Sequence, residues 1–311
     1  MRESAVVRIL PDGRRMHLHD GPIDIVLEAF GPPDEIRAAY SAAAKRFVTV
    51  LDELCNELPL LRQPWRPTMK PDGTMARRMV KAVAPFAERV FITPMAAVAG
   101  AVAEEILNAM IATTDLTRAY VNDGGDVALH ISPGQQFVVG MIEHSQWVAH
   151  HMKTPQFPSL FGKVTLGSAH PVRGIATSGW RGRSFSLGIA DAVTVLARTA
   201  SEADAAATVI ANAVDLPGHP AITREPACEI APDSDLGDRL VTRAVSSLNA
   251  DEITEALIAG TLVAESLLSS GLIHAAALHL CGETRLVAAG TDYMNLGQAE
   301  QPTLSGSRVR V

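Results

Sequence analysis

The chain has 311 residues, of which 47% are hydrophobic and 20% charged, a composition typical of a globular protein with a substantial buried core. Its 27 basic and 34 acidic residues give a formal net charge of −7, which argues against a surface that binds nucleic acid by neutralising phosphates. Three widely spaced cysteines, Cys55, Cys228 and Cys281, suit neither a disulfide framework nor a C-x-x-C metal site, so we expect a reducing, cytoplasmic location.

The first third of the chain is predicted to start with β-structure and to continue with helices. AVVRIL and RRMHLHDGPIDIVLEAF flank a Pro-Asp-Gly turn in which glycine supplies the positive φ, and they predict a β-hairpin. The spacing of apolar residues predicts helices over 34–58, 75–90 and 95–114, with an irregular, proline-rich connection over 61–74. The third of these helices is so rich in alanine and glycine that its neighbours must approach its backbone closely.

A membrane-spanning segment is not expected. The apolar stretch from Pro94 to Ala103 stops at Glu104 and Glu105, which makes it too short to cross a bilayer. The N-terminal residues contain no apolar run of signal-peptide length.

From Arg118 onward short apolar runs replace the helical period. The runs 118–123, 127–132, 136–143 and 162–168 predict a meander, with 144–162 as a surface loop or a lid over a site. Strands over 173–179 and 185–199, a helix over 202–214 opened by Ser201, an amphipathic helix over 250–271 and a closing hairpin over 274–290 follow in that order.

These elements predict an α+β fold in which mixed, largely antiparallel sheets pack against helices. We expect a single domain over 1–290, with room for two intimate lobes, and a frayed polar tail over 291–311. The flat apolar faces of the helices are compatible with homo-oligomerisation, although the number of subunits stays open.

The sequence VNDGGD at 121–126 is the first stretch that can carry chemistry. Gly124 and Gly125 allow a tight turn whose N–H groups face outward toward a phosphate or a carbonyl, while Asp123 and Asp126 supply carboxylates. Taken alone, a hairpin turn with Asx capping explains this stretch better.

The sequence ATSGWRGRS at 176–184 is the second. On an extended chain Arg181 and Arg183 would share a face and could grip an anion, Thr177 and Ser178 add hydroxyl groups, and Trp180 could stack on a flat ring. The competing interpretation is a loop whose arginines pair with the surplus acidic residues.

The helix sequence ADAAATVIAN is the third. Asp204 and Thr208 are four residues apart and project from one helix face, where a carboxylate and a hydroxyl can share a hard cation such as Mg²⁺. Alternatively, Asp204 complements the helix dipole and Thr208 bonds its own backbone. His17 and His19 share a strand face, but no cysteine or carboxylate accompanies them at zinc-ligand spacing.

In order along the chain, ITPMAAVAGAVAEEIL, VNDGGDVALH, ATSGWRGRSFSLGIADAVTVLA, ADAAATVIANAV and SDLGDRLVT resemble the motifs of the ApbE superfamily, the magnesium-dependent flavin transferases. The similarity runs from about Arg8 to about Gly290 and is greatest to the cytoplasmic branch named as ApbE-like thiamine biosynthesis or UPF-type proteins. The resemblance implies an ApbE-like fold, related to the tunnelling fold, with a cleft for a flavin nucleotide and a divalent metal.

The resemblance also implies roles for particular residues. Mg²⁺ would bind Asp204, Thr208 and a main-chain carbonyl near Val98. The nucleotide, FAD or FMN, would lie beside two turns; the implied binding residues are Asn122, Gly124, Gly125, Asp126, Thr177, Ser178 and Gly179. For catalysis the candidates are Arg181 and Arg183, which would orient the anion, and Asp191.

The chain departs from the family pattern at two places. The lysine before the glycine of the first helix motif is Ala99 here, and the segment after T-S-G is shortened to WRGRSFSLGI, without the usual histidine. We therefore expect a magnesium-dependent transferase or hydrolase acting on a flavin nucleotide or another small anionic substrate. The alternatives are a flavin- or metal-binding maturation protein without turnover, and flavin transfer by a relocated base such as His170 or Asp191.

Overall fold

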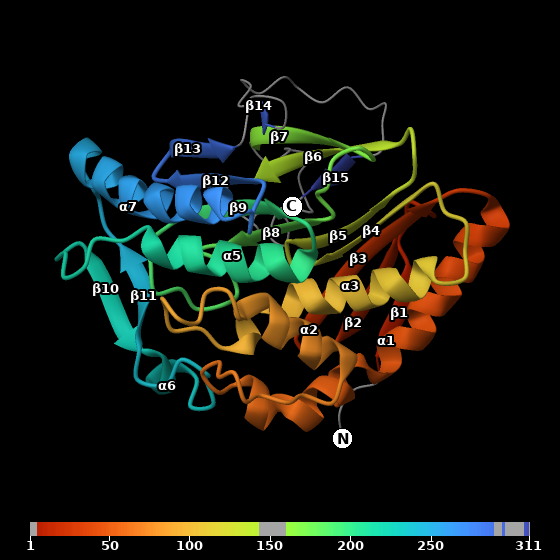
Figure 1. Cartoon of the computed structure of the whole chain (residues 1–311), viewed down its shortest axis with the longest axis horizontal. Coiled ribbons are helices and arrows are strands. Elements are labelled where there is room, and N and C mark those ends of the chain that lie inside the picture. The colour runs from red at the N-terminus through yellow and green to blue at the C-terminus, as the bar shows by residue number, and fades with distance from the viewer. Residues whose placement is uncertain (1–4, 143–159, 289–293, 296–307, 311) are drawn as a thin grey trace.

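The computed structural model describes residues 5–142, 160–288, 294–295 and 308–310. A nine-stranded sheet runs through the molecule in the order β1-β2-β3-β4-β5-β8-β9-β12-β13, and every neighbouring pair in it is antiparallel (Figure 1). Its strands are β1 (Val6–Ile9), β2 (Met16–Asp20), β3 (Ile23–Phe30), β4 (Arg118–Asp123), β5 (Asp126–Ile131), β8 (Gly174–Ser178), β9 (Ala192–Ala197), β12 (Ala275–Leu280) and β13 (Glu283–Ala288).

Helices cover one face of this sheet. α1 contacts β2 and β3, α3 contacts β4 and β5, α5 contacts β8 and β9, and α7 contacts β12 and β13. The helical elements are α1 (Pro33–Leu61), α2 (Thr74–Val83), the 3₁₀ turn η1 (Pro94–Ala97), α3 (Val98–Ile111), α5 (Ala200–Ala213), α6 (Ala227–Ile230) and α7 (Ala250–Ser269). The main hydrophobic core lies between these helices and the sheet.

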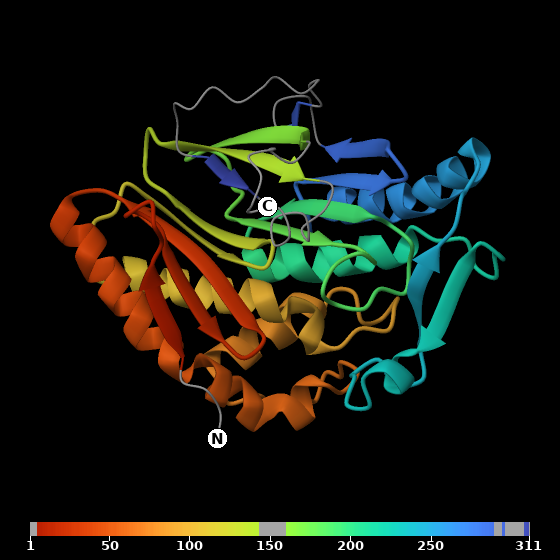
Figure 2. The ribbon, with the colours of Figure 1, turned by 180° about the vertical axis from the view of Figure 1, so that it is seen from behind.

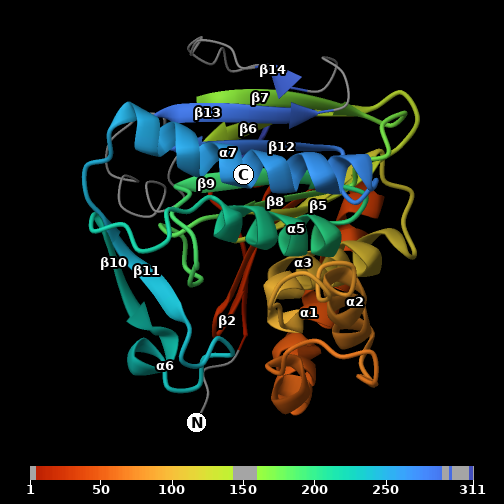
Figure 3. The same cartoon turned by 60° about the vertical axis from the view of Figure 1, so that its left-hand side comes forward.

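A second, four-stranded sheet packs on the opposite face of the large one (Figure 2). Its strands are β6 (Gln136–Ile142), β7 (Leu160–Gly167), β14 (Met294–Asn295) and β15 (Arg308–Arg310). Phe137 and Val139 of β6 meet Leu129 of β5 and Ile175 of β8 in a separate buried cluster. A two-stranded ribbon, β10 (Ile222–Pro226) with β11 (Leu240–Val245), stands apart from both sheets with α6 between its strands (Figure 3).

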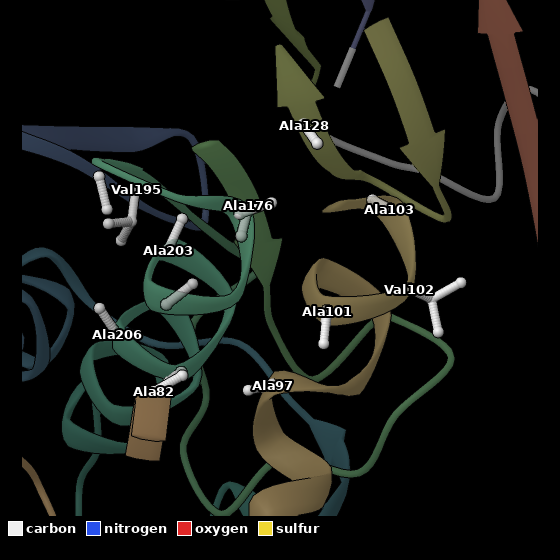
Figure 4. Packing of buried hydrophobic residues seen from close by; sticks show 14 of the residues in the cluster. Ala82, Ala97, Ala101, Val102, Ala103, Ala128, Ala176, Val195, Ala203 and Ala206 are labelled. Carbon is white, nitrogen blue, oxygen red and sulfur yellow. The ribbon is translucent and has the colours of Figure 1, made fainter. Parts of the chain in front are cut away.

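The alanine-rich sequences of α3 and α5 let these two helices pack closely, as predicted (Figure 4). A Cβ atom placed on Gly100 of α3 would lie 2.3 Å from the carbonyl oxygen of Ala200, at the start of α5. Because the obstacle is backbone, it cannot rotate away. This contact sets how near α5 comes to the start of α3.

Replacing Gly100 by alanine is therefore expected to destabilise the fold. The substitution gains about 1 kcal/mol of helix propensity, but forcing the helices apart costs more, so we expect a net loss of about 2 kcal/mol of unfolding free energy. Urea denaturation measures this loss. The control is Gly167→Ala, since a Cβ at Gly167 meets its nearest atom at 3.8 Å; an equal loss in both variants would contradict the close-packing explanation.

The structure confirms the α+β class and the largely antiparallel sheets, and it corrects several predicted elements. The first hairpin is extended by a third strand, β3, and Gly13 has the positive φ expected of its turn. The predicted meander is divided, because β6 and β7 leave the large sheet and β5 pairs with β8 instead. Of the strand expected over 185–199, only Ala192–Ala197 is regular, because residues 179–191 form turns and bends.

Three further differences lie later in the chain. Thr199, not Ser201, caps α5, and its side chain accepts a hydrogen bond from the N–H of Glu202. The β10–β11 ribbon was not predicted, and short strands of the tail pair with β7 and β6 although we expected fraying. Most of the predicted lid at 144–162 falls outside the described residues.

In the described part of the chain, one segment, Pro94–Ile111, is long and apolar enough to cross a membrane by length and composition. Half of that segment is buried inside the protein. Its two acidic residues, Glu104 and Glu105, both form ion pairs with Arg78 of α2. The segment is therefore packed as a core helix of this fold.

Candidate functional site

Asp204 joins α5 to the start of α3. Its Oδ2 atom accepts a hydrogen bond of 3.0 Å from the N–H of Gly100, and the N–H of Ala99 also stabilises the carboxylate. Val98, whose carbonyl is the predicted metal ligand, is the residue just before Ala99 at the junction of η1 and α3. Thr208 lies one turn after Asp204 on the same helix, and both side chains are partly buried.

The hairpin between β4 and β5 brings further carboxylates to this place. Asp123 and Asp126 face each other across its two-glycine turn, in which Gly124 and Gly125 have φ values of 66° and 119°. The Asn122 side chain accepts a hydrogen bond of 2.8 Å from the N–H of Gly125 and so holds the turn. Both the turn chemistry and the exposed carboxylate positions of VNDGGD are therefore present in one hairpin.

The T-S-G turn approaches the same hairpin. The N–H of Thr177 donates to Oδ1 of Asp126 at 3.3 Å, and the Thr177 hydroxyl lies 2.9 Å from that of Thr194. Ser178 ends β8, and a Cβ on Gly179 would lie 2.4 Å from the Asp191 carbonyl oxygen. Glycine at 179 is thus required for the close approach of the two segments.

The three aspartates strongly influence one another because they lie together in a region with little water. Burial raises the pKa of Asp123 and the pKa of Asp204, each to about 7. Burial also raises the pKa of Asp126 well above its usual range, and the nearby charge of Asp204 raises it further. Protons or a cation are needed to neutralise this concentration of negative charge.

Arg183 is the cation nearest to this group. Its Nη2 lies 4.0 Å from Oδ1 of Asp123, and its Nη1 donates to the Pro22 carbonyl in the β2–β3 turn. A Cβ on Gly124 would lie 2.1 Å from the same Nη2, so the guanidinium rests on the glycine turn. The Arg183 side chain is 57% exposed, which leaves the opposite side of the guanidinium open to a ligand.

Arg181 belongs to a different cluster, which corrects the prediction that both arginines share one face. The prediction assumed an extended chain, but residues 181–184 form a turn and bends. The Nε atom of Arg181 lies 2.5 Å from Oδ1 of Asp191, and its guanidinium stacks on the Trp180 ring. Arg181 thus pairs with an acidic residue, as the competing interpretation proposed.

Asp191 is a structural anchor. Its carboxylate accepts hydrogen bonds from Nε1 of Trp180, from Nε of Arg181 and from the N–H of Cys281, and the residue is 7% exposed. A carboxylate with three donors is a poor base, because each bond stabilises its charged form. We therefore no longer assign Asp191 a catalytic role.

The donors near Asp204 suit a hard cation. In the part of the chain that the structure describes, no three side chains among histidine, cysteine, aspartate and glutamate converge as a ready metal site. A set of one carboxylate, one threonine hydroxyl and one main-chain carbonyl consists of oxygen only, which is what Mg²⁺ prefers, with water completing the shell. The excess of buried negative charge around these atoms fits such an ion.

Two structural supports of this site were not predicted. Glu104 of α3 accepts hydrogen bonds from both the N–H and the hydroxyl of Ser201, which ties α3 to the first turn of α5. Asn212, near the end of α5, accepts the N–H of Leu187 and so holds the loop that carries Arg183. Both contacts join segments far apart in the sequence, so no local pattern could have indicated them.

A family model described as AbpE bacteria matches residues 7–286. The chain belongs to this ApbE-like family. Curated relatives include UPF0280 proteins of Methanococcus vannielii, 36% identical over 138 residues, and of Methanopyrus kandleri, 36% identical over 146 residues. These matches cover 44% and 47% of this chain and 51% of each relative, so the chain spans about half the length of the curated relatives it matches.

Solved structures with a similar arrangement are more distant in sequence. The ApbE protein of Thermotoga maritima has 14% identity and a TM-score of 0.46, with 90% of this chain and 96% of that chain covered. The flavin transferase ApbE of Vibrio cholerae has 12% identity and a TM-score of 0.34, with 95% and 96% covered.

Proposed function

We propose that this protein is a magnesium-dependent enzyme that acts on a flavin nucleotide, or on another small substrate bearing a phosphate. The observation that carries the proposal is the group of Asp123, Asp126 and Asp204, whose pKa values are raised by burial and which has Arg183 as its neighbouring cation. Such a group is costly to ionise without a further positive charge. A divalent ion supplies that charge and, when bound, polarises a phosphoryl oxygen of the substrate.

The proposed division of labour follows the contacts. Asp204, Thr208 and the Val98 carbonyl hold the ion, and the N–H groups of Ala99 and Gly100 orient the Asp204 carboxylate. Arg183 and the glycine turn receive the phosphate, since a guanidinium and outward N–H groups both bind anions. Membership of the ApbE-like family and the flavin transferase title printed for a distant structural neighbour favour a flavin nucleotide.

Titration calorimetry with Mg²⁺ and with FAD tests this function. We expect wild type to bind Mg²⁺ and Asp204→Ala to lose that binding while staying folded, because the variant removes a repelling charge. Arg183→Gln is expected to weaken FAD binding about tenfold, which corresponds to the loss of one charged hydrogen bond.

Arg181→Gln is the matched control for the second variant, because Arg181 lies in the same loop but pairs with Asp191. It should bind FAD as wild type does. Equal Mg²⁺ binding in wild type and Asp204→Ala, or none in either, would end the metal assignment. Flavin retained without any consumption of FAD after Mg²⁺ addition would favour a binding or maturation protein instead.

A further inference from the structure

The first strands carry a histidine and aspartate pair beside the proposed site. His19 of β2 and Asp24 of β3 are direct partners in the antiparallel register, so both side chains lie on one face of the sheet. Nδ1 of His19 lies 3.2 Å from Oδ2 of Asp24, and the His19 side chain is 44% exposed. The sheet register therefore sets the geometry of the pair.

This contact determines which nitrogen of His19 carries a proton. An ionised carboxylate can only accept hydrogen bonds, so Nδ1 must donate, and in the neutral ring Nε2 keeps its lone pair. No described residue is bonded to Nε2 of His19. An imidazole held at one nitrogen by a carboxylate and open at the other is the arrangement of a general base.

His17 lacks this freedom although it lies on the same strand face. Its Nε2 contacts the other carboxylate oxygen of Asp24 at 3.3 Å, and its Nδ1 accepts a hydrogen bond of 3.1 Å from Nε of Arg8. Both of its nitrogens are thus occupied. His170, the base suggested by the sequence, is likewise engaged, since its Nδ1 accepts the N–H of Gly167.

Direct contacts connect the pair to the acidic group. The N–H of Asp24 donates to Oδ1 of Asp123 at 3.3 Å, and Arg183 bridges Asp123 and the Pro22 carbonyl in the turn between His19 and Asp24. The turn that carries the pair therefore borders the guanidinium to which we assign the phosphate. A substrate held by Arg183 would lie at the rim where His19 is exposed.

We propose that His19 is the general base of this enzyme and that Asp24 is its positioning residue. The inference rests on the proposed function, because it needs a phosphorylated substrate at Arg183. In the step, a hydroxyl of water or of an acceptor side chain forms a bond from its oxygen to the phosphorus of the FMN part of FAD. The bond from that phosphorus to the bridging oxygen breaks, AMP leaves with the electron pair, and Nε2 of His19 takes the hydroxyl proton.

The test compares His19→Gln with His17→Gln in an assay of AMP release from FAD and Mg²⁺. We expect His19→Gln to lower kcat by 10²- to 10⁴-fold, the usual contribution of a general base, with FAD and Mg²⁺ binding unchanged. His17→Gln removes a ring from the same strand face but leaves His19 and its carboxylate oxygen in place. Its kcat should stay within about threefold of wild type.

A second readout needs no substrate. Long-range ¹H–¹⁵N NMR reports the tautomer of each histidine, and it should place the proton of neutral His19 on Nδ1. Asp24→Asn offers one acceptor oxygen in place of two and is expected to shift the tautomer balance of His19 and to lower kcat more than it changes KM.

The outcomes separate this inference from the proposed function. Equal turnover by wild type and His19→Gln, or a proton found on Nε2 in wild type, would overturn the role of His19 and leave the metal and flavin proposal standing. A wild-type protein that binds Mg²⁺ and FAD but releases no AMP would overturn both the proposed turnover and the base. Loss of turnover in His19→Gln with both ligands still bound supports the pair.

Discussion

The metal-free protein is expected to become less stable as the pH rises from 5 to 7, and saturating Mg²⁺ is expected to restore most of the loss at pH 8. Burial raises the pKa of Asp123 and Asp204 from 3.8 to about 7, so between these values the folded state binds more protons than the unfolded chain. Where the folded state binds more protons, the free energy of unfolding falls with rising pH. The loss should end above about pH 7, where both states are ionised.

We expect a decrease of a few kcal/mol across this window and a Tm lowered by several degrees. Mg²⁺ at a hundred times its Kd would return about 2.7 kcal/mol by binding the folded state alone. Thermal unfolding at pH 5, 6, 7 and 8, with and without Mg²⁺, measures both effects. Below pH 5 groups such as Glu53, whose pKa is lowered by its hydrogen bond from Arg46, change stability in the opposite direction.

Asp204→Asn serves as the control, because the amide keeps the size of the side chain but neither titrates nor repels Asp126. Its stability should depend less on pH, and Mg²⁺ should no longer raise its Tm. A wild-type Tm that is constant between pH 5 and 8, or an equal gain from Mg²⁺ in the variant, would contradict our account of the acidic group.

Asp191→Ala is expected to be the most damaging substitution in the loop after the T-S-G turn. It leaves the Cys281 N–H, the Trp180 indole and the Arg181 guanidinium without their shared acceptor in a region where Asp191 is 7% exposed. Unpaired buried donors and a broken ion pair should cost about 2 to 4 kcal/mol of unfolding free energy, which urea denaturation measures.

Arg181→Gln should cost less, since that side chain is 41% exposed and water can replace part of its interaction. If Asp191→Ala instead removed turnover while the unfolding free energy changed by less than about 0.5 kcal/mol, a catalytic role would have to be restored to Asp191. The two variants therefore distinguish an anchor from a base.

Local patterns in the sequence predicted most of the regular elements. The helices α1 and α7 and the closing hairpin, β12 with β13, follow from apolar spacing, and the turn at Gly13 follows from the need for a positive φ. The ordered motifs identified the ApbE-like family, which the match over residues 7–286 confirms. The metal ligands Asp204, Thr208 and Val98 and the nucleotide residues remain predictions, although the structure brings Asp204 to the start of α3.

The sequence by itself determined the class of fold, the family and the identity of the residues at three promising turns, because helix period, strand period and turn chemistry are local properties. Only the tertiary structure decided which of these residues work together. The nearness of Asp204 to Gly100, the separation of Arg183 from Arg181, and the pairing of His19 with Asp24 depend on helix packing and sheet register. These contacts join distant segments, and the burial that raises the pKa values of the aspartates exists only once the segments have met.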